Sequence, residues 1–461
     1  MNLEDFVIEH LHDDVSELLL HRSRWPGVDV ALAADCIAAR RKLRGKVPEW
    51  YADARLLFPS PLSAEQCSSS ATARFKAQLA MRAGRLRRPD EREPLRIADL
   101  TGGLGVDSWQ FATSGARVLY NEMNAMLAEA AAGNFSLMGL AGGSIECSCS
   151  EITPESLPAL LDRFRPDIVY LDPARRGTGG SKVFRLKECS PDVLQLQDII
   201  LGLRTKPAFS SRSTKPNRPA PLMMLKLSPM ADISQICREL HCVREVHCVE
   251  SCGECKELLV LCEPGFSGEP TVFADVLTDA AGNLDDEASP IIDLHPGTSF
   301  SFLSSEEAAA KPRPAGFASP GELVGKDLFE PGPALRKAGA FKLLASRFNF
   351  SALGPDAHFY LAGPAAAEAD GTLLKTAGLG RWWRIEDAAA FGKAGIRSLA
   401  TAHPHCGDFI ARGLPLRSEE LEAMYKAGAK RAKRTEKNSA HTKLFAAGSP
   451  AGRLLLYCTE V

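Results

Sequence analysis

Four residues at alternate positions in one glycine-rich stretch could hold a nucleotide-like cofactor. They are Asp99, Thr101, Gly103 and Gly105, within the sequence RIADLTGGLGVD. Glycines allow positive φ angles and let a ligand approach the main chain closely. A helix that begins directly after such a turn directs its N–H groups and the positive end of its dipole at the ligand. The stretch therefore predicts a cofactor-binding turn between a strand and a helix.

Two further acids stand at the ends of apolar runs, where they could complete the site. Glu122 can accept hydrogen bonds from both hydroxyls of a ribose, a property shared by sites for NAD and for S-adenosylmethionine. Asp172 is followed by Pro173. Its carboxylate can accept a hydrogen bond from a bound base or amine, and the proline fixes the loop so that its carbonyl faces the substrate. This pair favours an enzyme that holds an acceptor beside a methyl donor.

The glycine spacing separates the two cofactor classes. The dinucleotide fingerprint requires a third glycine for close helix packing, and counting from Gly103 and Gly105 puts Ser108 at that position. A methyltransferase loop instead has an acid and then small residues at alternate positions, which this stretch has. The loop and the Asp-Pro pair together favour S-adenosylmethionine and a methyltransferase.

These residues require a mainly parallel sheet with helical crossovers. We predict strands over 96–100, 116–122, 144–150, 167–172 and 222–227. We predict helices over 106–114, 125–138, 192–203 and 231–240, and another that opens at Thr153-Pro154. Two last strands, 243–249 and 257–262, are joined by only a few residues around Gly253, so they must be antiparallel. The fold class is α/β, a Rossmann-like sheet with a terminal antiparallel hairpin.

Outside this sheet the pattern changes. Apolar residues at three- and four-residue spacing predict an N-terminal helical region, with a further helix over 63–80. A strand is predicted at 299–303. The last part predicts a small α+β module, with strands at 382–385, 396–400 and 454–458 and helices at 387–394 and 418–426. The predicted domains are 1–92, 93–264, 265–380 and 381–461.

Residues 60–262 resemble the class I S-adenosylmethionine-dependent methyltransferases that carry a C-terminal THUMP-like domain. The matching pieces are EQCSSSATARFKA, DLTGGLGVD, YNEMN, DPARR, LKLSPM and ECKELL. Further pieces, LFEPGPALRKAGAF and the module from residue 381, also resemble this family, which often has a small ferredoxin-like segment between them. The resemblance implies a Rossmann-like class I sheet, C-terminal ferredoxin-like and THUMP-like modules, and an RNA substrate.

The resemblance also implies roles for particular residues. Cofactor binding falls to Asp99, Thr101, Gly103, Gly105, Asp107 and Glu122, and the candidate acid for the adenine ring is Glu151. From their own chemistry, we predict that Asp172, Pro173 and Arg175 form the catalytic group. Asp172 would orient the nucleophile, whereas Arg175 and Arg176 would grip phosphate. An alternative role for this arginine pair is an ion pair that shapes the loop.

A basic run near the C-terminus, KAGAKRAKRTEKNSAHTK, looks like an insertion relative to the family. It could bind the RNA backbone in a salt-dependent way, or it could be a solvated loop. Few aromatic residues flank it, so stacking on single-stranded bases has little support. The candidate contacts are Lys430, Arg431, Lys433, Arg434 and Lys437.

Methylation of a base carbon would need a cysteine nucleophile. Cys189 and Cys255 are available, but neither stands in a Pro-Cys context on the loop after the fourth strand. Cys252 and Cys255 form a lone C-x-x-C without a second pair, so we predict no metal site. An inactive methyltransferase fold that binds RNA and an NAD(P)-dependent oxidoreductase are also compatible with the motifs.

Composition sets the remaining limits. The chain has 461 residues, a net charge of -2 and 13 cysteines. An odd number of cysteines without secretory features indicates reduced thiols and a cytoplasmic protein. No apolar run approaches the roughly 20 residues that span a bilayer, so no membrane partner is expected. The near-neutral charge restricts any RNA surface to a local patch. The oligomeric state stays open.

Overall fold

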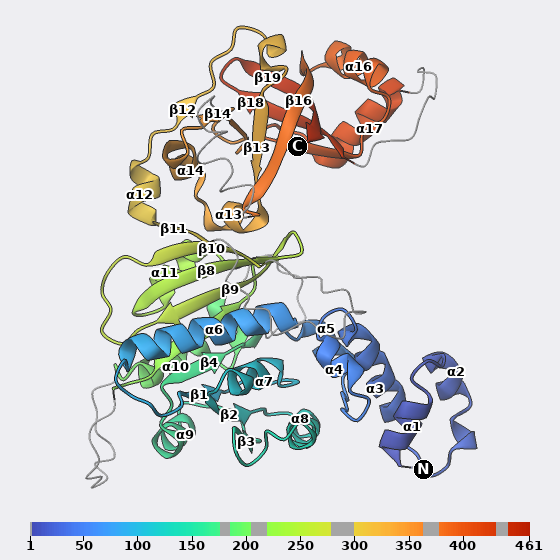
Figure 1. Ribbon diagram of the computed structural model, residues 1–461, viewed down its shortest axis with the longest axis vertical. Helices are drawn as coiled ribbons and strands as arrows, with labels where there is room; N and C mark the ends of the chain where they lie inside the picture. The colour runs from blue at the N-terminus through green and yellow to red at the C-terminus, as the bar shows by residue number, and fades with distance from the viewer. Residues whose placement is uncertain (1, 176–184, 204–218, 278–298, 363–377, 430–440) are drawn as a thin grey trace. The chain divides into compact units, whose positions relative to one another are not determined.

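The structure is a computed structural model that describes residues 2–175, 185–203, 219–277, 299–362, 378–429 and 441–461. Contacts divide the chain into two units. The first unit is Met1–Ser251 with Lys256–Pro270, and the second is Cys252–Cys255 with Thr271–Val461 (Figure 1). No helix within the described ranges is long and apolar enough to cross a membrane.

The N-terminal region is helical, as predicted. Its helices are α1 (Leu3–Glu9), α2 (Val15–Leu20), α3 (Val30–Leu43), α4 (Pro48–Ala52), α5 (Pro61–Gln66) and α6 (Ser70–Arg87). The helix expected over 63–80 is two helices, because the chain leaves α5 after Gln66. Ser69 and Thr72 then form a reciprocal cap in which each side chain bonds the other's backbone N–H, and this cap starts α6 anew.

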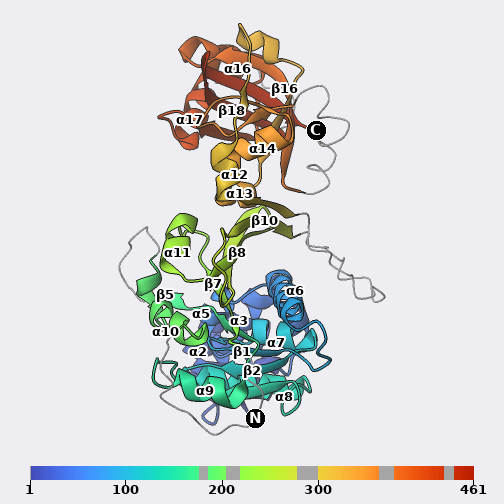
Figure 2. The ribbon, with the colours of Figure 1, turned by 90° about the vertical axis from the view of Figure 1, so that its left-hand side faces the viewer.

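The first unit contains the predicted sheet. Its strands are β1 (Arg96–Asp99), β2 (Arg117–Asn121), β3 (Ile145–Ser148), β4 (Ile168–Leu171), β7 (Leu222–Leu227), β8 (Val243–Ser251) and β9 (Glu254–Cys262). Its helices are α7 (Val106–Thr113), α8 (Ala125–Leu137), α9 (Leu157–Phe164), α10 (Val193–Ile200) and α11 (Ile233–Glu239). Among the strands of this unit the order is β8-β9-β7-β4-β1-β2-β3. Strands β7, β4, β1, β2 and β3 pair in parallel, and β9 pairs antiparallel with β7. Helices α6 and α7 lie on one face and α10 and α11 on the other (Figure 2).

Helix α9 begins later than predicted. It starts at Leu157. The Oγ1 of Thr153 accepts from the backbone N–H groups of Glu155 (3.3 Å) and Ser156 (3.2 Å), and its carbonyl accepts from the N–H of Leu157 over 3.0 Å. These are the bonds of an N-cap residue, so the predicted capping at Thr153-Pro154 is confirmed, although the regular helix begins only at Leu157.

The second unit contains another sheet. Its strands are β12 (Arg313–Pro314), β13 (Asp327–Pro331), β14 (Ser351–Ala352), β15 (Tyr360–Leu361), β16 (Gly380–Ala390), β17 (Asp408–Arg412), β18 (Thr442–Ser449) and β19 (Gly452–Glu460). The strand order is β12-β14-β15-β13-β16-β19-β18-β17. Strand β13 pairs with β16, so this sheet contains residues from both sides of the domain boundary predicted at residue 381. The division into domains at that residue stays a prediction. The longer helices are α16 (Lys393–Ala402) and α17 (Ser418–Ala429), and β10 (Thr271–Leu277) pairs antiparallel with β11 (Ser299–Leu303).

Two predictions in this unit are wrong. The segment 387–394 was expected to be a helix, but β16 continues to Ala390 because Ala388–Ala390 pair with β19. The segment 396–400 was expected to be a strand, but it lies in α16. Ile396, Leu399 and Ala400 are buried there at a spacing of three and four residues, which matches one face of a helix.

Candidate functional site

The glycine-rich turn joins β1 to α7, as predicted. Gly105 is the residue before α7 and has φ +91°, and Gly103 has φ +53°, so both adopt the region that favours glycine. A Cβ on Gly105 would lie 2.5 Å from Cζ of Phe135, whereas one on Gly103 would meet nothing within 4 Å. Gly105 is therefore required for packing, and the backbone at Gly103 faces open space.

Gly102, which was not predicted as a site residue, is also required for packing. A Cβ there would lie 2.1 Å from Cε2 of Tyr120. The hydroxyl of Tyr120 donates to the carbonyl of Gly103 over 2.6 Å, so the ring both fills the space beneath the turn and fastens it. The adjacent pair of glycines in the sequence was the signal for this close approach.

Glu122 lies directly beside the turn, at the carboxyl end of β2. Its Oε2 accepts from the backbone N–H of Gly103 over 2.9 Å, and its Oε1 accepts from that of Asn124 over 2.8 Å. The buried side chain of Asn121 donates to the carbonyl of Ser150 over 3.0 Å and so ties the ends of β2 and β3 together. Glu151 follows Ser150 and is exposed.

Asp99 is buried at the end of β1. It accepts from Oγ of Ser108 over 2.7 Å and from the backbone N–H of Thr101 over 3.2 Å. Ser108 stands where the dinucleotide fingerprint has its third glycine, and its hydroxyl fixes the side chain of Asp99. Burial raises the pKa of Asp99 to about 8, and its two hydrogen bonds offset this only in part.

Asp172 directly follows β4, the strand that pairs with β1, and the structure brings it to the same turn. Its backbone N–H donates to Oγ1 of Thr101 over 2.6 Å, which joins the ends of β1 and β4. Its Oδ2 accepts from Nζ of Lys226 on β7 over 2.6 Å. Pro173 is buried, and the backbone of Arg175 forms β5 (Ala174–Arg175), which pairs with β6 (Cys189–Ser190).

A buried charge cluster lies behind Asp172. Lys76 on α6 is fully buried, and its Nζ lies 3.0 Å from both carboxylate oxygens of Glu257 on β9 and 3.2 Å from Oδ1 of Asp107. Ser68 accepts from Nζ of Lys76 over 2.8 Å and donates to Oδ2 of Asp107 over 2.9 Å. Asp107 also accepts from the hydroxyl of Tyr170 over 2.9 Å. The structure therefore places Asp107 in this cluster.

The pKa values in the cluster follow from burial and charge. Burial raises the pKa of Glu257, and the positive charges of Lys76 and Lys226 offset this only in part. Burial alone would lower the pKa of Lys226. Its carboxylate neighbours Asp172, Glu257 and Asp107 outweigh burial, so the pKa of Lys226 lies above its ordinary value and the side chain is charged at neutral pH.

Lys76, Lys226 and Glu257 were not predicted as members of the site. Each stands inside a piece that carried the family resemblance, respectively EQCSSSATARFKA, LKLSPM and ECKELL. A lysine within an otherwise apolar strand, as in LMMLKL, was the visible signal. The remaining predicted contacts, Arg176, Lys430, Arg431, Lys433, Arg434 and Lys437, lie outside the described residues.

Comparison with known proteins supports the fold. A family model described as a ferredoxin-like domain matches residues 328–365. The crystal structure of a putative methyltransferase from Porphyromonas gingivalis W83 is similar over 100% of this chain and 97% of its own, with a TM-score of 0.75 and 25% identity. The chain has the class I methyltransferase fold. No curated protein sequence matches it.

Two other solved structures match smaller shares of this chain. A SAM-dependent methyltransferase from Agrobacterium tumefaciens has 17% identity and a TM-score of 0.27, over 51% of this chain and 60% of its own. A tRNA (uracil-54, C5)-methyltransferase from Pyrococcus abyssi, in complex with S-adenosyl-L-homocysteine, has 16% identity and a TM-score of 0.24, over 45% of this chain and 41% of its own.

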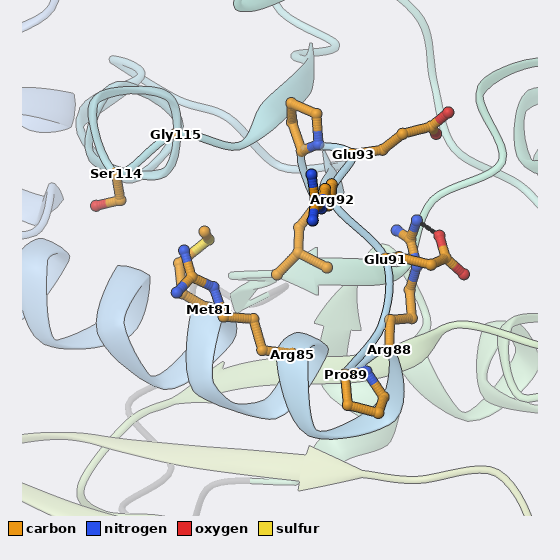
Figure 3. Close-up of a pocket in the computed structure, with 11 residues that line it drawn as sticks. Met81, Arg85, Arg88, Pro89, Glu91, Arg92, Glu93, Ser114 and Gly115 are labelled. Carbon is orange, nitrogen blue, oxygen red and sulfur yellow. Dashed lines mark ion pairs between the residues drawn. The ribbon is translucent and has the colours of Figure 1, made fainter.

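A cavity of about 460 Å³ lies elsewhere in the methyltransferase fold (Figure 3). It is lined by the end of α6 and by residues that precede β1 and β2, so it lies at the amino ends of these strands. Arg88, one of its lining residues, donates to Oδ2 of Asp167 over 2.5 Å. Ligands of open parallel sheets bind at the carboxyl ends, where the glycine-rich turn and Asp172 meet. The cavity is therefore separate from the candidate site.

The raised pKa of Asp99 makes the stability of the methyltransferase unit depend on pH. The folded protein holds the proton of Asp99 up to about pH 8, whereas the unfolded chain releases it near pH 4. This contribution to stability is therefore complete below pH 4 and decreases until about pH 8. We expect Asp99→Asn to reduce the loss of stability between pH 5 and 8, as measured by urea unfolding. If the free energy of unfolding falls with pH equally steeply in the variant and the wild type, Asp99 is not the source of this pH dependence.

Proposed function

We propose that the protein transfers a methyl group from S-adenosylmethionine to a nitrogen or oxygen atom of RNA. The observation that carries this proposal is the hydrogen bond between Thr101 and Asp172. It joins the glycine-rich turn, a place for a methyl donor, to an acidic residue at the carboxyl end of the neighbouring strand, a place for an acceptor. The class I methyltransferase fold supports the donor, and the resemblance to THUMP-bearing enzymes supports RNA.

The residues present fit S-adenosylmethionine. The backbone at Gly103 faces open space, so a ligand can lie against the main chain there. The carboxylate of Glu122 stands within 2.9 Å of the backbone N–H of Gly103, where it can accept from ribose hydroxyls. We propose that the turn from Asp99 to Gly105 and Glu122 hold the cofactor, with Glu151 beside the adenine ring.

The cofactor supplies an electrophilic methyl group on a sulfonium sulfur. The protein's part is to hold the acceptor in line with that group, because alignment and proximity account for most of the catalysis of such a displacement. Asp172 is suited to orient the acceptor, since its backbone is fixed by Thr101 and its side chain by Lys226. We propose that Pro173 shapes this loop and that Arg175 and Arg176 hold phosphate. The basic residues from Lys430 to Lys437 are proposed as further backbone contacts.

Binding of methyl-labelled S-adenosylmethionine to the purified protein tests the donor. We expect binding by the wild type and at least tenfold weaker binding by Gly102→Ala, whose new Cβ would collide with Tyr120 beneath the turn. Gly133→Ala is the matched control, because a Cβ there meets nothing within 4 Å and alanine suits the interior of α8. Binding of NAD(P) in place of S-adenosylmethionine would favour an oxidoreductase. Cofactor binding without methyl transfer to RNA would favour an inactive RNA-binding protein.

A further inference from the structure

Lysine and carboxylate side chains alternate from the protein interior to the acceptor side of the proposed site. In the inner pair, Lys76 is fully buried and the side chain of Glu257 is 3% exposed. In the outer pair, Lys226 and Asp172 are 16% and 32% exposed. A substrate can therefore touch the outer pair, whereas the inner pair can act on it only through its charge.

The sheet register produces this order. Leu171 on β4 pairs with Leu225 on β7, so Asp172 and Lys226 follow at the same level at the carboxyl ends of parallel strands. Strand β7 pairs antiparallel with β9, where Leu227 is opposite Leu258, and this brings Glu257 to the same end. The position of Lys226 among the three carboxylates of Asp172, Glu257 and Asp107 keeps it an ammonium group.

An ammonium group beside the acceptor distinguishes between the two possible acceptor atoms. A neutral nitrogen gains positive charge as it is methylated, so an adjacent ammonium group opposes the reaction. A carboxylate without a neighbouring cation would stabilise the positive charge that develops on such a nitrogen. A hydroxyl oxygen instead gains negative charge as it loses its proton, and an ammonium donor stabilises that charge. The ion pair of Asp172 with Lys226 offers a proton acceptor and such a donor 2.6 Å apart.

We infer that the acceptor is a hydroxyl group, which in an RNA chain is the ribose 2′-hydroxyl, and that Lys226 is a catalytic residue. This inference rests on the proposed function. Lys226 donates a hydrogen bond to the hydroxyl oxygen, and Asp172 accepts the hydroxyl proton. Lys76 and Glu257 form the buried inner pair, and the charge of Glu257 helps to keep Lys226 protonated.

The step balances as a methyl transfer. The oxygen forms a bond to the methyl carbon with the electron pair of its former O–H bond, and the proton passes to the carboxylate of Asp172. The bond from the methyl carbon to sulfur breaks, and sulfur keeps that electron pair as a neutral thioether. The products are a ribose methyl ether and a protonated carboxyl group, which returns its proton to solvent.

Alkaline hydrolysis of methylated RNA tests the acceptor directly. Total RNA from a strain that lacks this gene is incubated with the wild-type protein and S-adenosylmethionine labelled in the methyl group. Alkali cleaves RNA through the 2′-hydroxyl, so a 2′-methyl ether leaves an uncleaved dinucleotide. We expect the label in alkali-stable dinucleotides. Label in mononucleotides would overturn the inference and keep the proposed function, whereas no transfer by a wild type that binds the cofactor would overturn both.

Variants of Lys226 test its role in the same assay. We expect Lys226→Met to lower kcat by about 10²–10³-fold, the loss typical of one donor to a developing oxyanion, with less than a threefold change in cofactor affinity. Lys226→Arg should recover part of the rate.

In an Asp172→Asn background, Lys226→Met should have little further effect on kcat. This double variant also removes the unpaired carboxylate that could impair folding. Arg163→Met is the control, because it removes a charge on α9 from a side chain that is 55% exposed and pairs with Glu146. A Lys226→Met protein with the wild-type kcat would overturn the role.

Discussion

Replacing Asp172 with asparagine is expected to lower kcat for methyl transfer to RNA by about 10²–10⁴-fold, the range for loss of a positioned acid or base. The amide cannot accept the acceptor's proton, and it removes the negative charge that Lys226 contacts at 2.6 Å. The backbone bond from residue 172 to Thr101 stays, so the turn keeps its geometry. Cofactor affinity should therefore change little. Single-turnover transfer from labelled S-adenosylmethionine and equilibrium binding measure the two quantities separately.

Asp198→Asn is the matched control for this variant. Asp198 lies on α10 with its side chain 32% exposed, and its Oδ1 lies 3.0 Å from Nδ1 of His241, so its replacement should leave both kcat and cofactor affinity unchanged. If Asp172→Asn loses cofactor binding in proportion to its rate, Asp172 supports the donor site and our assignment of it to the acceptor is wrong.

Replacing Lys76 with methionine is expected to destabilise the first unit by about 3–5 kcal/mol, the cost of breaking a buried ion pair from one side. Lys76 is fully buried and contacts Glu257 and Asp107. Without it, the carboxylate of Glu257 keeps its desolvation cost and loses its nearest cation. Since burial already raises the pKa of Glu257, this group would become neutral more readily, and the variant should be more stable at pH 5 than at pH 8. Urea unfolding at both pH values measures the effect.

A second variant separates charge from packing. Lys76→Met combined with Glu257→Gln removes both partners, so it should recover part of the lost stability. Lys42→Met is the surface control. Lys42 forms an ion pair with Glu65 in which both side chains are at least 41% exposed, and such pairs contribute about 0–1 kcal/mol. Equal losses for Lys76→Met and Lys42→Met would show that the buried cluster does not contribute to stability.

Local patterns in the sequence predicted the glycine-rich turn, Glu122 and Asp172 at strand ends, and a parallel sheet with a final antiparallel hairpin. Each depends on neighbouring residues and on the rule that parallel strands end at one edge. The pairing of Lys76 with Glu257 could not be found in this way, because 181 residues separate them and nothing local shows that the lysine is buried. Alanine-rich segments caused the errors between β16 and α16, since alanine at 388–390 fits a helix by propensity and a strand only through its partners in β19.

The hydroxyl of Tyr120 holds the carbonyl of Gly103, and the carboxylate of Glu122 holds the backbone N–H of the same residue. Gly103 is thus restrained at both its N–H and its carbonyl, by one side chain on β2 and one that directly follows this strand. A loop that is ordered in advance loses little conformational entropy when a ligand arrives. In the wild type, cofactor affinity should therefore depend mainly on direct contacts and the release of water. Loss of Tyr120, which packs beneath the loop, would remove one of the two restraints, so binding would have to order the turn and cofactor affinity should fall.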